Sequence, residues 1–237
     1  MTHGTNGAAT LANANGQVKE GLDEILRFSA RLMAQRGYHG TSLRDIASET
    51  GRSLSGLYHY FQTKEDLVYW INVRGFSALT RSLKAVLKEL PNPEDRLYAL
   101  IYNHLDYFAH HRDEMKVLML GTHNLTVERI EEIRSLKDGY TDMGRQLVLE
   151  FLKSRDCEVP DAKGLARLTY LLFGMMNWIF GWYSPQKHGT GKDLVDDIFN
   201  TFVDGVCKQP KATDRRERVG KLVAAVQKEW AGSHHHE

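Results

Sequence analysis

The sequence predicts an all-α fold, and three observations lead to it. Apolar residues recur at intervals of three and four along most of the 237 residues, which is the period of an amphipathic helix. No segment shows the strict alternation expected of a half-buried strand. Because proline disrupts helix interiors, the positions of the five prolines favour long helices joined by short connections. These prolines are Pro91, Pro93, Pro160, Pro185 and Pro210.

The N-terminal quarter is expected to begin with an arm and then to form three helices. Residues 1–16 are small, polar and without a period, so we expect a disordered arm. The expected helices cover 18–37, 41–51 and 53–60. Either Thr41 or Ser42 caps the second of them, because a hydroxyl at this place accepts from a free backbone N–H. Gly51 then provides a tight turn before the third.

The rest of the chain is expected to form five or six further helices. Thr63 stands three residues before Asp66, which is the spacing of a capping box and marks a helix start. That helix ends before Pro91, and Pro93 occupies the first turn of the next one. Later helices are expected over 115–120, from about Thr126, over 165–183 and over 194–206. Beyond Pro210, a charged segment with apolar Val219, Leu222, Val223 and Val226 suits an extra amphipathic helix, and the His-containing tail over 233–237 is a tag remnant or a disordered end.

Composition describes an ordinary globular protein and excludes few functions. The chain is 42% hydrophobic and 26% charged, and its formal net charge is +1. The two cysteines, Cys157 and Cys207, are far apart in sequence, so a disulfide framework is not expected and a reducing cytosol is favoured. No apolar run approaches the roughly 20 residues of a membrane span, and no secretory signal stands at the N-terminus. The predicted location is therefore cytoplasmic.

The most informative stretch is GYHGTSLRDIASETGRSLSGLYHYFQTKEDL, over residues 37–67. Two short helices with a tight turn between them make a helix-turn-helix, and its second helix fits the DNA major groove. Thr41, at a helix start, has a hydroxyl and a backbone N–H for a phosphate. Further donors follow along the second helix and the start of the next, and Gly56 allows the backbone to approach DNA closely. The stretch therefore predicts a DNA-binding head.

These residues resemble the TetR family of bacterial repressors. The resemblance rests on Gly-X-X-X-Thr-Ser-Leu-Arg-Asp-Ile-Ala, then Gly-X-Ser, Leu-Tyr-His-Tyr-Phe and Lys-Glu-Asp-Leu, in order and without a gap. The motif covers about the first third of the chain, and the remaining length and helical pattern also suit the family. The resemblance implies an N-terminal three-helix helix-turn-helix domain joined to a C-terminal helical ligand-binding and dimerisation domain. The expected divisions are 1–16 for the arm, 17–63 for the helix-turn-helix, 64–209 for the ligand-binding and dimerisation domain, and 210–237 for the extension and tail.

The resemblance also implies which residues contact double-stranded operator DNA. It places some at the DNA backbone, namely Thr41, Ser55, Tyr58, Tyr60 and Lys64, and others at the bases, namely Leu54, Ser55, Gly56 and His59. Arg44 and Ser53 add donors nearby, and Arg52, where the family usually has a small apolar residue, adds a phosphate contact. Leu54 stands where the family is often polar, which puts hydrogen-bonded readout there in doubt.

Two features of the predicted head bear on how it can bind DNA. Residues 17–75 carry eight Lys or Arg and seven Asp or Glu, so the head lacks the strongly basic character of a nonspecific DNA binder. Affinity is therefore expected to depend on geometry and dimerisation. Tyr58 and Tyr60 are two positions apart and cannot share a helix face, so one of the two is expected to pack in the core.

The C-terminal half is expected to form the dimer. The segment over 165–183 is apolar nearly all round, and 194–206 has a wide apolar stripe. Helices at 165–183 and 193–207 that pack against their symmetry mates would give a four-helix, self-complementary interface, which is also the family arrangement. Gly174 and Gly181 would allow a close approach. A monomeric core is the alternative interpretation of the same apolar pattern.

An effector pocket is predicted in the same domain. Its candidates lie on inward-facing stripes of the middle helices, where methionine and aromatic side chains suit an adaptable apolar cavity. Each of these side chains can also be ordinary core. His104, Asn177 and Arg145 are polar residues on such faces and need partners. The candidates are Tyr102, His104, Leu105, Phe108, Met119, Met143, Leu147, Phe173, Met176, Asn177 and Phe180.

The effector class is inferred from a further resemblance. The sequence Met-Asn-Trp-Ile-Phe-Gly-Trp-Tyr-Ser-Pro, followed by a short loop and an acidic amphipathic helix, is similar to the TetR subgroup that responds to acyl-CoA thioesters. An unspecified hydrophobic small molecule, or a protein partner as the trigger, are the alternatives. No phosphate-binding loop, nucleophile elbow or metal-spaced histidine set occurs, so we expect no enzyme activity, metal or cofactor.

Overall fold

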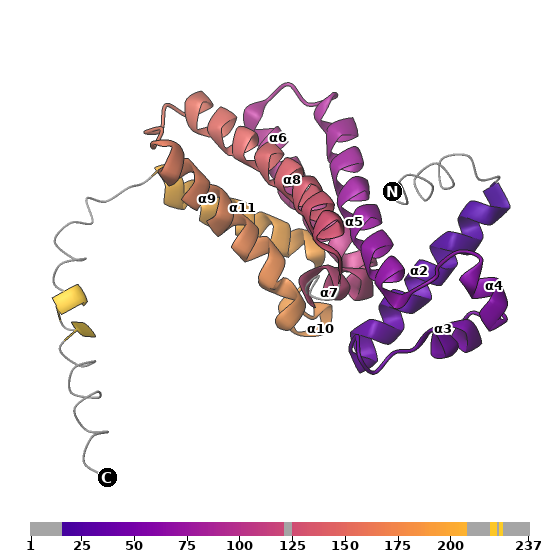
Figure 1. The fold of residues 1–237 in the computed structure, drawn as a ribbon. Helices are drawn as coiled ribbons and strands as arrows, with labels where there is room; N and C mark the ends of the chain where they lie inside the picture. The colour runs from indigo at the N-terminus through magenta and orange to yellow at the C-terminus, as the bar shows by residue number, and fades with distance from the viewer. Residues whose placement is uncertain (1–15, 121–124, 208–218, 222, 225–237) are drawn as a thin grey trace, which may run out of the picture.

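The computed structural model of the chain describes residues 16–120, 125–207, 219–221 and 223–224 (Figure 1). Within these residues the secondary structure is helical and no strand occurs, so the all-α prediction is confirmed. The helices are α2 Gly16–Arg36, α3 Leu43–Glu49, α4 Leu54–Tyr58, α5 Lys64–Leu87, α6 Pro93–His110, α7 Arg112–Leu120, α8 Val127–Ser154, α9 Ala162–Asn177, α10 Pro185–His188 and α11 Gly191–Cys207, with a 3₁₀ turn η1 at Trp178–Gly181. The predicted arm before Gly16 and most of the segment beyond Pro210 lie outside the described residues.

Helices α2, α3 and α4 form a small head at one end of the molecule (Figure 1). Ser42 caps α3 by accepting from the Asp45 N–H, while the Asp45 carboxylate accepts from the Ser42 N–H. Gly51, at φ +63°, turns the chain between α3 and α4. Ile46 and Leu57 are fully buried in a core that belongs to the head. The predicted helix-turn-helix is therefore present, with Ser42 rather than Thr41 as the cap.

Helix α5 joins the head to the rest of the protein. Thr63 and Asp66 form the predicted capping box at its start. With 24 residues, α5 is about 36 Å long at 1.5 Å per residue. Leu67 belongs to the core of the head, whereas Leu79 and Leu83 belong to the larger core of the C-terminal domain. Since one rigid helix takes part in both cores, a displacement of its C-terminal half also moves the head.

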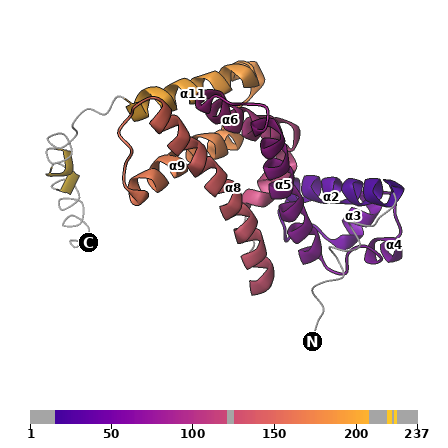
Figure 2. The ribbon, with the colours of Figure 1, turned by 90° about the horizontal axis from the view of Figure 1, so that it is seen from above.

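The C-terminal domain packs α6, α8, α9 and α11 together with the second half of α5 around one core. Figure 2 shows the head and the pair α9 and α11 on opposite sides of α5 and α8. Helix α7 lies between the two parts, because Met115 is buried in the C-terminal core and Val117 in the core of the head. Helix α7 is therefore a second connection between the domains, beside α5.

Several helix boundaries differ from the sequence-based predictions. The helix predicted over 165–183 stops at Asn177 and tightens into η1, because the chain must become extended at Ser184, the residue before Pro185. The short α10 was not predicted. Helix α11 begins at Gly191 rather than 194. At its start the Thr190 N–H donates to the Asp193 carboxylate, and the Asp193 N–H donates to the Thr190 hydroxyl. Helix α7 begins at 112 rather than 115, with acidic residues in its first turn.

The two cysteines correct the expectation that no disulfide forms. Cys157 follows α8 and Cys207 ends α11, and their Cα atoms lie 5.3 Å apart with the sulfurs bonded. The sequence separation of 50 residues gave no indication of this contact. It arises because α8 and α11 end at the same side of the domain. The bond closes a loop that contains α9, η1, α10 and α11.

Candidate DNA interface and effector cavity

Helix α4, the predicted recognition helix, is held by its ends and by one buried side chain. The Ser53 hydroxyl accepts from the Gly56 N–H at 3.1 Å and lies 3.1 Å from the Ser55 hydroxyl. Leu57 is completely buried and fixes the helix to the head. Ser55, the predicted backbone contact Tyr58 and the predicted base reader His59 are exposed, so the outer face of α4 presents hydroxyl and imidazole groups. Leu54 is half-buried against the core of the head.

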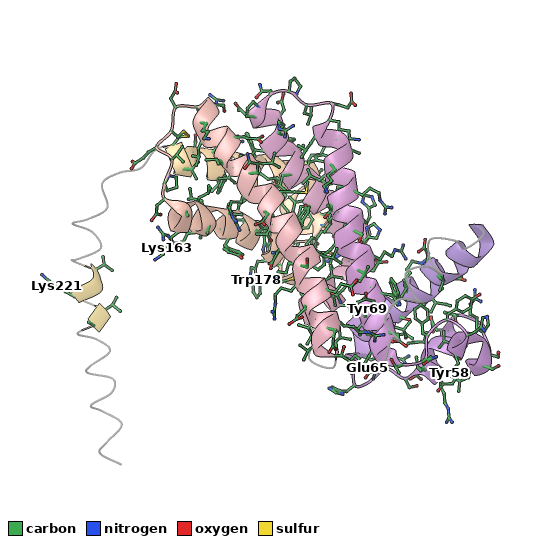
Figure 3. All side chains as sticks on the ribbon, turned by 45° about the horizontal axis from the view of Figure 1, so that its top comes forward. Tyr58, Glu65, Tyr69, Lys163, Trp178 and Lys221 are labelled. Atoms are coloured by element: carbon green, nitrogen blue, oxygen red, sulfur yellow. A yellow bond between two sulfur atoms is a disulfide. The ribbon has the colours of Figure 1, made fainter. Side chains whose placement is uncertain are left out.

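Tyr58 and Tyr60 have different environments, as the spacing predicted. Tyr58 is 47% exposed, whereas Tyr60 packs against the core of the head. The guanidinium of Arg52 lies over the Tyr60 ring at 5.7 Å from its centroid. Figure 3 shows Tyr58 on the head, at the far end of the molecule from Trp178. Tyr60 is therefore the packing residue of the pair.

Thr41 and Lys64 make contacts inside the head. Thr41 is buried, and its hydroxyl donates to the Gly37 carbonyl at 3.0 Å. The Lys64 ammonium donates to the carbonyls of Tyr38 and Thr41, at 2.5 and 2.8 Å, and lies 4.0 Å from the Tyr38 ring centroid. An ammonium has three donors, so one N–H of Lys64 is left for a phosphate.

The two predicted arginines of the head differ in their contacts. Arg52 turns back toward α2, where its guanidinium lies 3.8 Å from the Glu24 carboxylate and close to Gly21. Arg44 is exposed on α3 and has no ion pair with another residue of the described chain. Of the two, Arg44 is thus the cation that is free to meet a phosphate.

The junction of α5 with the head contains contacts that the sequence did not suggest. Tyr38 donates its hydroxyl to the Glu65 carboxylate, and this hydrogen bond holds the pKa of Glu65 below its usual range. Arg129, in the first turn of α8, donates to the Asp66 carboxylate at 2.6 Å and lies over the Tyr69 ring at 4.9 Å. Burial would raise the pKa of Asp66, but the bonds from Arg129 and the Thr63 backbone outweigh it and lower the pKa.

A cavity of about 500 Å³ lies between α5, α6, α7, α8 and α9. Four of the predicted effector contacts line it, namely His104, Met119, Phe173 and Asn177. Its size falls in the range of small-molecule sites. The other lining residues are Asn72, Phe76, Leu79, Met115, Leu118, Ile130, Ile133, Arg134, Lys137, Tyr140, Thr141, Tyr170 and Gly174.

The remaining predicted contacts lie elsewhere. Leu105 and Phe108 line a smaller cavity of about 180 Å³ next to α7 and α11. Met143 lines an open groove between α5 and α8, and Tyr102 is 40% exposed in another groove beside α5. Leu147 and Met176 are buried in the core and line neither of these two cavities. Phe180 belongs to η1, and its side chain lies outside the described parts.

The cavity wall contains a neutral histidine. His104 is buried, and its Nε2 lies 3.1 Å from the Asn177 Oδ1. Burial lowers the pKa of His104 to about 4, although the hydrogen bond to Asn177 opposes that shift. The His104 ring lies near those of Phe108, Tyr140 and Phe173, with centroids 5.3 to 5.9 Å apart. This buried polar group of the cavity is therefore uncharged at neutral pH.

The rim of the cavity is basic. Arg134 and Lys137 are exposed on α8, three residues apart, and so lie on one side of the helix. Neither forms an ion pair within the described parts of the chain. Neither residue was among the predicted effector contacts, because those were chosen from the apolar stripes of the helices. Arg145, which was expected to need a partner, pairs with Asp142 at 2.7 Å.

The face of α9 that turns away from the core is apolar and exposed. Tyr170 and Leu171 are 58% and 63% exposed, and Trp178, just after α9, is 66% exposed. Gly174 lies between them and has open space around its Cα. Such a cluster of large apolar side chains is typical of a protein interface. It lies on one of the two helices predicted to form the dimer.

Among the described residues there is neither a candidate membrane span nor a metal site. No helix among them is long and apolar enough to cross a membrane. The described residues also contain no group of three or more histidine, cysteine, aspartate or glutamate side chains that could hold a metal ion.

Comparison with known proteins identifies the two parts of the fold. Residues 25–69 match the family described as bacterial regulatory proteins of the tetR family, and residues 91–206 match the tetracyclin repressor-like C-terminal domain. The transcriptional repressor KstR2 of Mycobacterium tuberculosis H37Rv is 32% identical over 201 residues, covering 82% of this chain and 96% of the relative. KstR2 of Rhodococcus jostii RHA1 is 45% identical over 193 residues, covering 77% and 89%. The structure of AibR in complex with isovaleryl coenzyme A and operator DNA superposes with a TM-score of 0.66 at 25% identity, covering 76% of this chain and 97% of AibR.

Proposed function

The chain belongs to the TetR family of DNA-binding transcriptional repressors, and we propose that a small hydrophobic effector, an acyl-CoA thioester, releases it from its operator. The family consists of regulators and not of enzymes. The observation that carries the effector proposal is the cavity of about 500 Å³ with apolar walls and an unpaired basic rim. An acyl group suits such walls, and Arg134 and Lys137 suit the phosphates of coenzyme A.

The similarity to AibR supports the same effector class. AibR binds isovaleryl coenzyme A and operator DNA, and its fold covers most of this chain. A regulator triggered by a protein partner is the alternative, and a closed C-terminal core would favour it. The cavity between α5 and α9 favours the small molecule instead.

For the DNA interface, we propose that the exposed face of α4 enters the major groove. Ser55, Gly56, Tyr58 and His59 are the residues on or beside that face with access to bases and phosphates. The remaining N–H of Lys64 and the free Arg44 supply positive charge for the DNA backbone. Thr41, Arg52 and Tyr60, whose side chains are engaged within the head, support the shape of the interface.

The contact between Arg129 and Asp66 offers a route from effector to DNA. Ile130 and Ile133 line the cavity, and Arg129 in the same turn of α8 is bonded to Asp66 in the first turn of α5. A ligand that displaces this end of α8 would therefore pull on the capping box that starts α5. Because α5 is rigid and takes part in the core of the head, the distance between the two heads of a dimer would then no longer match the two half-sites of the operator.

The experiment that tests this proposal is a titration of the purified protein onto its own upstream DNA, with and without a panel of acyl-CoA thioesters. Release of specifically bound DNA by a thioester supports the proposal, and binding that no thioester affects contradicts the effector class. The variant Arg134→Ala with Lys137→Ala should keep operator affinity but need about tenfold more thioester for release. Lys153→Ala, an exposed lysine near the other end of α8, is the matched control.

A further inference from the structure

Two polar atoms in the wall of the effector cavity have no hydrogen-bond partner among the described residues. They are Nδ1 of His104 on α6 and the hydroxyl of Tyr140 on α8, and both are buried. The two side chains line the same cavity, and their rings lie nearly parallel with centroids 5.9 Å apart. Buried polar atoms in folded proteins nearly always have a partner, so a group from outside the chain is expected to supply one.

The hydrogen bond on the other side of the imidazole defines what Nδ1 requires. The amide oxygen of Asn177 can only accept, so His104 Nε2, 3.1 Å away, carries the proton. Because burial keeps the ring neutral above about pH 4, the imidazole holds no second proton. Nδ1 is therefore an acceptor, and it needs a donor.

The Tyr140 hydroxyl has the complementary requirement. Burial raises its pKa, an effect that nearby Asn103 only partly offsets, so the group stays protonated and has an O–H to donate. The Asn103 amide donates one N–H to the Leu79 carbonyl at 3.2 Å, and its second N–H could only donate to the Tyr140 oxygen, not accept from it. Phe173, whose ring centroid lies 5.8 Å from that of Tyr140, adds an apolar wall beside it. The Tyr140 O–H therefore needs an acceptor within the cavity.

We propose that this cavity recognises a hydroxyl group on its effector, which donates to His104 Nδ1 and accepts from the Tyr140 O–H. The inference rests on the proposed function, since it concerns the same cavity. A hydroxyl has one donor and two acceptor positions, so a single group has the hydrogen-bonding capacity that the two atoms require. A ketone only accepts and leaves Nδ1 without a donor, and a hydrocarbon leaves both atoms unpaired. The preferred effector is therefore a hydroxylated apolar molecule rather than its oxo or saturated counterpart.

The test compares cyclooctanol, cyclooctanone and cyclooctane, which differ in one group and fit the cavity. Their dissociation constants are measured by NMR titration of the full chain and of Tyr140→Phe and His104→Phe. The hydrocarbon leaves water more readily than the alcohol does, and this raises its affinity for wild type and variants alike. The informative quantity is therefore the affinity of the alcohol divided by that of the hydrocarbon, compared between wild type and variant. That ratio should fall about 10- to 100-fold in either variant, the loss expected when one buried hydrogen bond is removed. The ketone should depend on Tyr140 and not on His104.

The matched control is Tyr107→Phe, which removes a largely buried hydroxyl that bonds to Glu114 at 3.3 Å and does not line the cavity. It should leave the ratio unchanged. In wild-type protein labelled with ¹⁵N-histidine, the Nδ1 resonance of His104 should move when cyclooctanol binds and stay in place with cyclooctane. A ratio that Tyr140→Phe and His104→Phe leave unchanged overturns the inference, and so does failure of cyclooctanol to bind. The proposed function is judged separately, because none of these measurements involves operator DNA or a thioester.

Discussion

Tyr58 and Tyr60 belong to one motif but have different roles, one on the surface of the head and the other in its packing. Tyr58 is 47% exposed beside the face proposed to meet DNA, while Tyr60 packs on the core of the head beneath the Arg52 guanidinium. We expect Tyr58→Ala to weaken operator binding about tenfold and to change the free energy of unfolding by less than about 0.5 kcal/mol. Tyr60→Ala should instead lower the free energy of unfolding by about 1–2 kcal/mol, because it removes buried ring surface.

Both variants can be measured by DNA titration and by urea unfolding at one pH. Tyr58→Phe is the control that removes only the hydroxyl, and it separates a phosphate hydrogen bond from ring contacts. If Tyr60→Ala kept full stability and lost only DNA binding, the assignment of Tyr60 to packing would be wrong.

His104 gives the protein a specific dependence on pH. Its pKa is lowered by burial to about 4 in the folded chain, against 6.5 in the unfolded chain. Between these values the unfolded state binds a proton that the folded state does not, so the stability from this group is present above pH 6.5 and is lost as the pH falls toward 4. At 1.36 kcal/mol per unit, the loss amounts to about 3 kcal/mol.

Urea unfolding of wild type and His104→Phe at pH 7.5 and at pH 4.5 measures this loss. The stability difference between the two pH values should be smaller in His104→Phe, since its carboxylates titrate as in the wild type and only the histidine is missing. The comparison uses the change with pH, so a general destabilisation by the new ring does not affect it. Equal pH dependence in both proteins would show that His104 is not buried in its neutral form.

At the scale of helices, the sequence predicted the starts that carry a local capping signal better than the other boundaries. The caps at Ser42 and Thr63 and the early Pro93 are local signals, because a hydroxyl or a proline acts on the next few residues of its own chain. The stop of α9 at Asn177 was missed, since an apolar run continues through η1 to Tyr183. Hydrophobic pattern shows that such a segment is buried but not where its geometry changes.

The cavity was predicted less completely than the head for a physical reason. His104 and Asn177 are 73 positions apart in sequence and meet only after α6 and α9 have packed. Tyr102 and Met143 follow the same apolar pattern as the lining residues, yet they line other grooves. Helical period identifies a buried stripe, whereas the choice between core, cavity and groove depends on which helix covers it. The DNA head was predicted more fully because its motif is contiguous.

The pair Arg129 and Asp66 makes the contact between α8 and α5 testable. We expect Arg129→Ala to retain operator binding while reducing the effect of the effector, because α8 then no longer pulls on the start of α5. The quantity to measure is the ratio of effector affinities with and without operator DNA, which is the coupling between the two sites. In Arg129→Ala this ratio should come about tenfold closer to one, the value at which the two sites are not coupled.

The control for this variant is Glu131→Ala, which changes an exposed residue two positions along α8. It should leave the coupling as in wild type. Reciprocity provides a further check, since operator affinity with and without effector must change by the same factor. Full coupling in Arg129→Ala would mean that the signal reaches the head by another connection, for which α7 is the candidate because it contacts both cores.

At the scale of the whole molecule, the disulfide between Cys157 and Cys207 closes the C-terminal part of the fold. It restricts the unfolded chain by joining residues 50 positions apart, and a loop of that length corresponds to about 4 kcal/mol of stability in the chain-entropy model. We expect reduction by dithiothreitol, or Cys157→Ser with Cys207→Ser, to lower the free energy of unfolding by about 2–4 kcal/mol. A dithiothreitol effect that persists in the double variant would show that the reductant acts elsewhere.

Dimerisation is the property on which operator recognition depends for the molecule as a whole. The head has little excess positive charge, so one head alone is expected to bind DNA weakly, and specific binding requires two heads held about 34–36 Å apart. The exposed apolar face of α9, with Tyr170, Leu171 and Trp178, is the surface proposed to hold that spacing together with α11. A carboxylate placed in this face would be buried without a partner in the dimer but would meet only water in the monomer.

Leu171→Glu should therefore separate the subunits without unfolding them. Leu171 is 63% exposed in the single chain, so the folded monomer loses little packing, while the dimer dissociation constant should rise about 100-fold or more. Sedimentation measures the dimer, and DNA titration should show operator affinity lost in parallel. Val159→Glu, an exposed residue in the loop before α9, introduces the same charge outside the proposed interface and should change neither. If Leu171→Glu remained dimeric and bound its operator normally, the spacing of the heads would have to be set by a different surface.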